Sequence, residues 1–181
     1  MSDQPEFKPW PKITRKNRAV VVSEKIDGTN ALVCVTESGD VLAGSRTRWI
    51  TPADDNYGFA RWVYDNADSL RVLGPGYHYG EWAGRGIQRG YGLSDRRFYL
   101  FNSGRWNNDE TRPACCHVVP VLGTGFEKDG IVDRCVEDLR VNGSRVTPGF
   151  PAEGVVVYHT ASGLMQKITL VGDEKPKGSA E

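Results

Sequence analysis

The chain has 181 residues, which suits one domain and is short for two. Its 23 Lys and Arg residues balance its 23 Asp and Glu residues, so bulk charge alone does not hold the protein on nucleic acid or a membrane. No segment approaches the ~18 consecutive apolar residues of a membrane-spanning helix, and the first residues lack the apolar core of a signal peptide. We therefore predict a cytoplasmic protein that does not contact a membrane.

The N-terminal residues 1–18 carry five basic side chains and three prolines, which predicts an extended basic lead-in. After it, short apolar segments are separated by turns rich in Gly, Asp and Asn, the pattern of strands and hairpins. Strands are expected over 19–25, 31–36, 41–45, 77–83, 98–102, 117–123, 154–160 and 164–170.

Two further segments repeat their apolar residues at helical spacing, 59–73 and 128–143. Residues 172–181 are polar and are expected to form a loose tail. The predicted fold is therefore α+β, a single domain over 19–171 with antiparallel sheets and helices packed on the sheet faces. The strands and helices do not alternate as in a dinucleotide-binding fold, and a phosphate-binding loop of the GxxxxGK[ST] type is missing.

The sharpest chemical feature is the segment Glu24-Lys25-Ile26-Asp27-Gly28-Thr29-Asn30. A lysine there ends an apolar strand, so a turn presents its amine at the mouth of a sheet. A lysine becomes a nucleophile when its surroundings favour the uncharged amine. A bare Lys-x-Asp-Gly is nevertheless common by chance, and other motifs have to support it.

Further motifs follow in a defined order. Arg46 lies in Ser-Arg-Thr-Arg, Glu81 in Gly-Glu-Trp-Ala-Gly, Phe101 in Phe-Tyr-Leu-Phe-Asn, Glu153 opens an apolar strand, and Lys167 lies on the last one. The ordered set resembles the covalent nucleotidyltransferases, that is, ATP-dependent ligases and mRNA capping enzymes. It is most similar to the RNA ligase 2-like branch, and the resemblance spans residues 24 to 167.

The resemblance implies the fold of a nucleotidyltransferase (adenylation) domain and a three-step reaction. Lys25 would attack the α-phosphate of ATP and form a lysyl-AMP. AMP would then pass to the 5′-phosphate of an RNA, and a 3′-hydroxyl would seal the strand. Mg²⁺, with Mn²⁺ as a substitute, is the implied metal. An end-healing or substrate-binding accessory protein is a further expected partner.

The resemblance also implies roles around the nucleotide. Glu24 and Ile26 would contact the nucleotide, Glu24 in the adenine pocket, and Asn30 would orient phosphate or ribose. Arg46 would bind ribose or the incoming 5′-phosphate, because its planar guanidinium can hold a phosphate at two points. Phe101 would stack on adenine, with Phe98 as the alternative because alternation gives the face of a strand but not its exposure.

Three charged residues complete the implied site. Glu81 would lie at the ribose or the metal, Glu153 would help to hold the metal, and Lys167 would neutralise the α-phosphate. The family usually places a second lysine two positions before the last one, where this chain has Met165. The five arginines between residues 84 and 105, with the lead-in, are expected to contact RNA.

Alternative functions stay open at this level. The chain leaves no room for an oligonucleotide-binding barrel or a helical domain after Lys167, so a minimal catalytic core is expected. ATP is favoured over NAD, which requires an additional N-terminal domain, and GTP stays possible. A DNA ligase core, a guanylyltransferase core and a non-catalytic nucleic-acid binder are the competing interpretations, the last supported by Met165.

Overall fold

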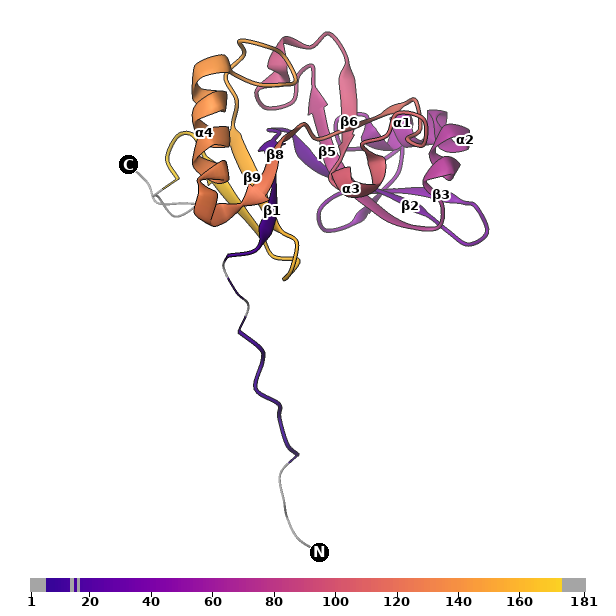
Figure 1. Ribbon diagram of the computed structural model, residues 1–181. Coiled ribbons are helices and arrows are strands. Elements are labelled where there is room, and N and C mark those ends of the chain that lie inside the picture. Colours follow the sequence, from indigo (N-terminus) through magenta and orange to yellow (C-terminus); the bar gives the residue numbers. More distant parts are fainter. Residues whose placement is uncertain (1–5, 14, 16, 174–181) are drawn as a thin grey trace, which may run out of the picture.

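Two β-sheets, joined by the turn that follows Lys25, form the framework of the protein (Figure 1). The structure is a computed structural model that describes residues 6–13, 15 and 17–173. Residues 6–13, 15 and 17, within the expected lead-in, contain no helix or strand, and their side chains are exposed. The expected tail lies outside the described residues except for Gly172 and Asp173.

The first sheet has four antiparallel strands in the order β10-β9-β1-β8. These strands are β1 (Ala19–Lys25), β8 (Val121–Phe126), β9 (Gly154–His159) and β10 (Met165–Thr169). Helix α4 (Ile131–Asn142) packs along this sheet (Figure 1). Its buried residues Cys135, Val136 and Leu139 form one apolar cluster with residues of β1 and β9.

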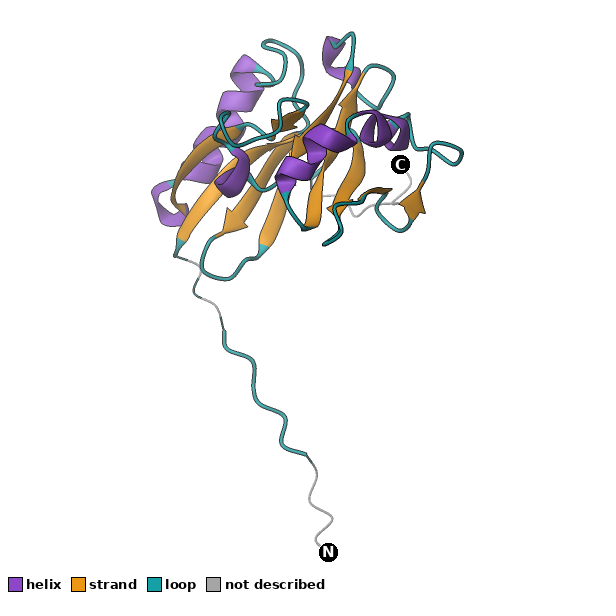
Figure 2. Cartoon of the chain, turned by 90° about the vertical axis from the view of Figure 1, so that its right-hand side faces the viewer, coloured by secondary structure: helices purple, strands orange, loops and turns teal. Residues whose placement is uncertain are grey.

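The second sheet has six strands in the order β4-β3-β2-β5-β6-β7. They are β2 (Thr29–Val35), β3 (Val41–Gly44), β4 (Trp49–Ile50), β5 (Gly76–Gly84), β6 (Arg96–Leu100) and β7 (Cys116–Val118). Short helices cover one face of this sheet, as Figure 2 shows: α1 (Phe59–Asp65), α2 (Ala67–Leu70) and α3 (Ser103–Trp106). The 3-10 turns are η1 (Arg71–Leu73), η2 (Gly90–Gly92) and η3 (Glu127–Asp129).

Successive side chains of β5 point to opposite faces of the second sheet, and one of these faces is buried. His78, Gly80 and Trp82 point towards the helices and are buried. There Phe59 of α1 packs against Trp82 and Phe98, each at 5.3 Å between ring centroids. The intervening side chains of β5 point to the opposite face, which the described helices leave open.

The α+β architecture predicted from the sequence is confirmed, and most predicted strands lie within two residues of their expected ends. The strand predicted over 117–123 is wrong, because it is two strands that belong to different sheets, β7 and β8. Pro120 separates them, since proline lacks the N–H that a continuing ladder needs. Its carbonyl instead accepts a hydrogen bond from the Glu24 N–H at 2.8 Å. The β6–β7 pair is parallel, unlike the antiparallel hairpins expected.

The predicted helices are shorter than expected. The segment 59–73 is divided into α1, α2 and η1, with the first break at Asn66. The second helix begins only at Ile131, after Gly130 in the left-handed conformation. Strand β4 and helix α3 were not predicted, because both are too short to show a periodicity. Among the described residues, no helix has the length and apolarity needed to cross a bilayer.

Replacement of Gly154 by alanine tests the packing of β9 against β10. A Cβ at this position would lie 2.0 Å from the carbonyl oxygen of Ile168, so the strands would have to separate. We expect Gly154→Ala to lower the free energy of unfolding by about 1–3 kcal/mol, measured by urea denaturation. The control is Gly104→Ala, whose Cβ meets only Asn102 Oδ1 at 3.6 Å. Equal unfolding midpoints for both variants would contradict this account of Gly154.

Candidate active site

A cleft of about 850 Å³ opens where the two sheets meet, and it collects charged groups from both. Its lining includes the end of β1, the following turn, the start of β2, the middle of β5, the residue before β9 and a residue of β10. Seven of the nine residues predicted for the site line this cleft: Lys25, Asn30, Arg46, Glu81, Phe101, Glu153 and Lys167. Glu24 and Ile26 do not.

Lys25 is the last residue of β1, and its amine donates a hydrogen bond to Glu153 Oε2 at 2.6 Å. This contact follows from the strand register, because Lys25 lies opposite Gly154, the residue that follows Glu153. Both side chains are largely shielded from solvent, with 23% and 17% exposed. Lys167, on β10 at the other side of β9, lines the same cleft. The first sheet therefore contributes two amines and one carboxylate.

The turn after Lys25 is fixed by contacts with the second sheet and the glycine-rich loop. The N–H of Gly28 donates to Glu81 Oε1 at 3.1 Å, and the N–H of Asp27 donates to the hydroxyl of Tyr91 at 2.7 Å. Arg89 Nε donates to Asp27 Oδ2 at 3.0 Å. A side chain larger than hydrogen does not fit at Gly28, where a Cβ would lie 2.4 Å from the carbonyl oxygen of Trp82.

Sequence reasoning missed Tyr91, which is fully buried and has a positive φ of 51°. Its ring packs on Phe150 at 5.6 Å between centroids, and its carbonyl accepts a bond from Thr147 Oγ1. Tyr91 thus connects the turn after Lys25 to the segment after α4. Its place in a glycine-rich loop gave no sign of burial, so only the structure could identify it.

Glu81 is a carboxylate in an unfavourable environment for its charge. Burial raises its pKa from the ordinary 4.5 to about 7, with nearby Glu153 and Asp27 adding to the rise, while Lys25 and the Gly28 N–H act in the opposite direction. Asn30 Nδ2 donates to its other oxygen at 3.4 Å, since the two residues are paired across β2 and β5. Near neutral pH, Glu81 can therefore take up or release a proton.

Glu24 points away from the cleft because successive side chains of β1 alternate between faces. It is 1% exposed and accepts hydrogen bonds from Ser144 Oγ at 2.5 Å and from the Arg145 N–H at 2.8 Å. Burial raises the pKa of Glu24, against these two bonds. The structure therefore places Glu24 where it anchors β1 to the segment after α4, and its expected adenine contact stays a prediction.

Ile26 packs with Ala83, Tyr91, Tyr99 and Val119 in a small apolar cluster. Its side chain supports the turn from the interior, so its expected nucleotide contact also stays a prediction.

The two phenylalanines left open by the sequence have different positions. Phe98 is fully buried in the core of the second sheet, whereas Phe101 is 42% exposed and lines the cleft. Of the two, only Phe101 is therefore accessible from the cleft. Stacking on adenine stays a prediction.

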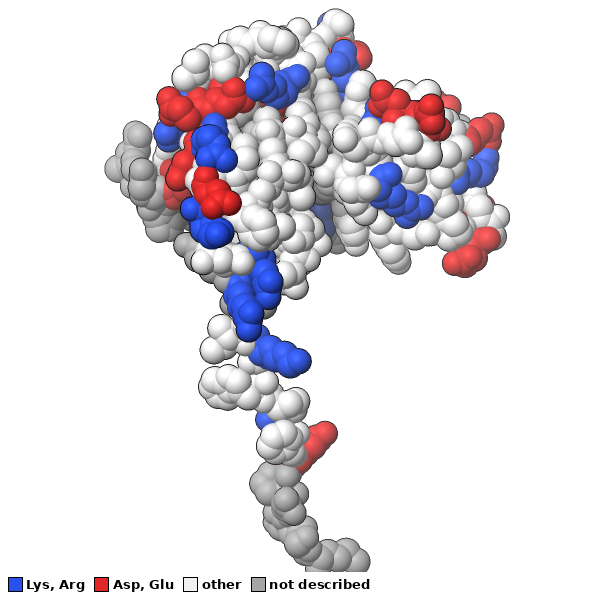
Figure 3. Space-filling model, viewed as in Figure 1, with Lys and Arg blue, Asp and Glu red and all other residues white. Residues whose placement is uncertain are grey.

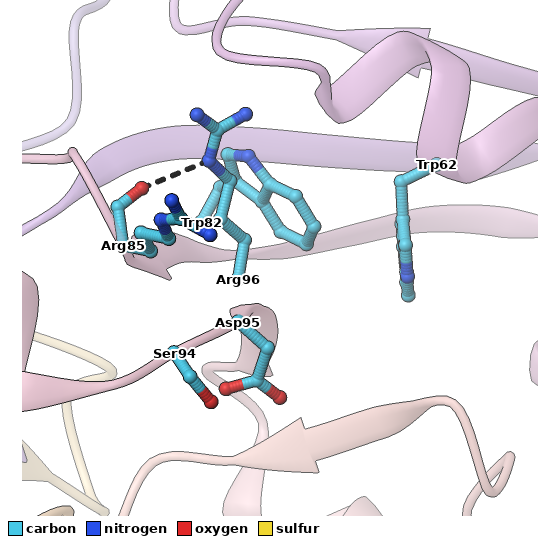
Figure 4. A pocket seen from close by; sticks show the side chains of 6 residues that line it. All are labelled: Trp62, Trp82, Arg85, Ser94, Asp95 and Arg96. Carbon is cyan, nitrogen blue, oxygen red and sulfur yellow. Dashed lines mark hydrogen bonds between the residues drawn. The ribbon is translucent and has the colours of Figure 1, made fainter.

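Most arginines of the loop expected to contact RNA have partners within the protein. Arg89 binds Asp27, Arg97 binds Asp95, and Arg105 donates to the Leu73 carbonyl. Arg96 donates to the carbonyls of Arg85 and Tyr57. Figure 4 shows Arg96 beside Trp82, in a second cavity of about 520 Å³. This cavity lies on the helix side of β5, away from the Lys25 cleft.

Comparisons with known proteins identify the family and the fold of this chain. A family model described as RNA ligase matches residues 18–169, so the chain belongs to the RNA ligase family. A structure titled Naegleria gruberi RNA ligase with PPi matches with a TM-score of 0.63 and 18% identity, over 85% of this chain and 50% of that chain. The E227A mutant of that ligase, with ATP and Mn, matches with a TM-score of 0.62 and 18% identity over the same shares.

A third structure, the E312A mutant of the Naegleria gruberi ligase with AMP and Mn, gives a TM-score of 0.61 at 18% identity, again over 85% of this chain and 50% of that chain. The present chain thus spans about half the length of these ligases. At this level of identity the matches establish the shared fold, which is the one predicted for the nucleotidyltransferase domain.

The raised pKa of Glu81 predicts how stability depends on pH. The folded protein holds this proton more tightly than the unfolded chain, so the unfolding free energy should fall as pH rises from about 4.5 to about 7. In Glu81→Gln this downward slope should be smaller, because the Glu81 proton no longer contributes to it. Urea unfolding at a series of pH values measures the slope. The control Glu37→Gln, in an exposed turn, should keep the slope of the original protein.

Proposed function

We propose that this chain is the catalytic core of an ATP-dependent RNA ligase in which Lys25 carries AMP. The observation that supports this most directly is the Lys25 amine, held 2.6 Å from Glu153 inside a cleft that also contains Lys167 and Glu81. The membership of the RNA ligase family gives the reaction class. The Naegleria gruberi structures with ATP, AMP and Mn support the choice of nucleotide and a divalent metal.

In the first step the Lys25 nitrogen forms a bond to the α-phosphorus of ATP, and the bond from that phosphorus to pyrophosphate breaks. The nitrogen must lose a proton, and Glu153 Oε2 is the carboxylate oxygen in contact with it. Lys167, in the same cleft, supplies a positive charge for the phosphates. Reactions of this kind depend on positioning and charge neutralisation, which a preformed cleft provides.

In the second step an oxygen of the RNA 5′-phosphate attacks the same phosphorus and releases Lys25. In the third, the 3′-hydroxyl attacks the 5′-phosphorus and expels AMP, so the strand is sealed. Arg46 and Asn30 line the cleft and are proposed to bind phosphate or ribose, with Phe101 proposed for the adenine ring. An accessory end-healing protein and a cytoplasmic location stay predictions from the sequence.

The residues of the cleft fit a metal ion that arrives with the nucleotide. Magnesium is commonly held by one or two carboxylates together with substrate phosphates. Glu81 and Glu153 both face the cleft and provide such a pair. Among the described residues, no group of three or more Asp, Glu, His or Cys side chains forms a metal site without the substrate. When bound, the metal neutralises charge on the phosphates and the leaving pyrophosphate.

Labelling with ATP that carries ³²P at the α-phosphate tests the covalent step. We expect a labelled band that survives denaturing electrophoresis and is absent from Lys25→Ala. Lys128→Ala, at an exposed position of η3, is the matched control and should label normally. Intact mass detects any protein that was purified with AMP already attached. Absence of both label and added mass, with ATP and with GTP, would favour a non-catalytic nucleic-acid binder.

The missing second lysine can be restored. Met165 lies two residues before Lys167 on β10, so both side chains share one face, and Met165 is 66% exposed. We expect Met165→Lys to lower the KM for ATP in the labelling reaction by about two- to fivefold, the range of an exposed charge pair. Met165→Gln, which adds polarity without charge, should leave KM unchanged. An equal effect of both variants would show that charge is not the cause.

A further inference from the structure

A row of exposed aromatic side chains continues from the cleft across the open face of the second sheet. Its members are Trp49 of β4, Tyr77 and Tyr79 of β5, and Phe101 after β6, and we call them the aromatic strip. The Tyr77 and Tyr79 rings are 6.4 Å apart between centroids and 15° from parallel. Trp49 and Tyr77 are also 6.4 Å apart, at 30°.

The strip and the cleft lie on the same face of the sheet. Tyr77, Tyr79 and Glu81 alternate with the buried side chains of β5, and Tyr79 and Glu81 both line the cleft. Phe101 lies beside Tyr79, because the Phe101 N–H donates to the Tyr79 carbonyl at 3.0 Å. A polynucleotide end bound at Lys25 therefore has this row directly beside it.

The exposure of the strip is not explained by packing within the described residues. Trp49, Tyr77 and Tyr79 are 50%, 61% and 59% exposed. The aromatic core of the sheet, around Phe59 and Trp82, is on the opposite face beneath α1. Scattered exposed aromatic residues are ordinary, but a contiguous row on a soluble protein marks an interaction site.

We propose that the aromatic strip binds a single-stranded segment of the RNA substrate, with bases stacked on the rings of Trp49, Tyr77 and Tyr79. The proposal rests on the proposed function. Stacking suits an enzyme that accepts many sequences, because every base has a π-face. Arg46, the arginine that lines the cleft beside the strip, has no hydrogen-bond or ion-pair partner among the described residues.

The charge distribution favours stacking over a purely electrostatic track. Most loop arginines are bound to carboxylates or carbonyls of the protein. On the face shown in Figure 3, the basic side chains form separate patches with acidic ones among them, mainly over α4 and along the lead-in. The formal net charge of the protein is zero, so bulk electrostatic attraction adds little to its affinity for RNA. Stacking on the rings of the aromatic strip would supply the affinity that charge does not.

The test is binding of a labelled single-stranded RNA of about 12 nucleotides, within the site sizes known for such grooves. Trp49→Ala and Tyr77→Ala should each weaken binding by about tenfold, as the loss of one stacked base predicts. The slope of log K against log salt should not change, because no phosphate contact is removed. Tyr64→Ala is the matched control: Tyr64 is 71% exposed but lies on α1, and its replacement should have no effect.

Two further variants separate stacking from general apolar contact. Tyr77→Phe keeps the ring and should retain the affinity, whereas Tyr77→Leu keeps apolar bulk without a ring and should bind as weakly as Tyr77→Ala. RNA with abasic sites should bind the original protein as weakly as intact RNA binds the strip variants. If Tyr77→Leu restores binding, or abasic RNA binds normally, the proposal is overturned in favour of an apolar protein-docking face or phosphate binding.

Self-labelling with ATP, measured without RNA, keeps this proposal distinct from the proposed function. If the unmodified protein is not labelled, the ligase mechanism is contradicted. The RNA affinities of the variants would then be interpreted without that mechanism. Normal labelling with unchanged RNA affinity in Trp49→Ala and Tyr77→Ala would overturn the strip proposal and leave the mechanism intact. The thermal unfolding temperature of each variant is compared with that of the original protein, to check that the sheet is preserved.

Discussion

The pairing of β1 with β9 brings Lys25 into contact with Glu153, a residue 128 positions further along the chain. The rest of the site depends on that register, because a slip of one residue would turn Lys25 towards α4 and bring Glu24 to the cleft. The register is stabilised from both faces of β1. On one face Glu24 is bound by Ser144 and Arg145, and on the other Lys25 is bound by Glu153. Loss of the partners of Glu24, or of the partner of Lys25, would leave a shielded charged group without a hydrogen bond and lower the stability of the fold.

The second constraint is the turn that connects the two sheets. Its N–H groups are bound by Glu81 from β5 and by Tyr91 from the glycine-rich loop. Glu81 therefore does two things: it fixes the backbone that follows Lys25, and it brings a carboxyl group to the cleft. Because this position desolvates the Glu81 side chain, its pKa is raised to about 7 and its charge state responds to a charge that enters the cleft.

The sequence predicts those features of the protein that depend on local residue patterns and on the order of the motifs. Apolar alternation located most strands of both sheets, though not β4, and the ordered motifs identified seven of the residues that line the cleft, from Lys25 to Lys167. It could not show that Pro120 divides one apolar segment between two sheets, since this depends on which strands are neighbours. Nor could it place Tyr91 or Ser144, whose contacts with Asp27 and Glu24 join distant segments. The choice between Phe98 and Phe101 likewise required knowledge of which face the helices cover.

The two carboxylates of the cleft differ in a way that bears on nucleotide binding. Glu153 is in contact with an amine at 2.6 Å, whereas the half-buried Glu81, among the described residues, accepts one bond from a backbone N–H and a longer one from the Asn30 amide. A cation that approaches Glu81 favours its ionised form, so binding of a metal–nucleotide complex should release a proton near pH 7. In the free protein Glu81 thus stays partly uncharged near pH 7 until a cation arrives beside it. This limits the cost of burying several acidic groups beside Lys25, and it links the assembly of the cleft to the substrate that the cleft is proposed to bind.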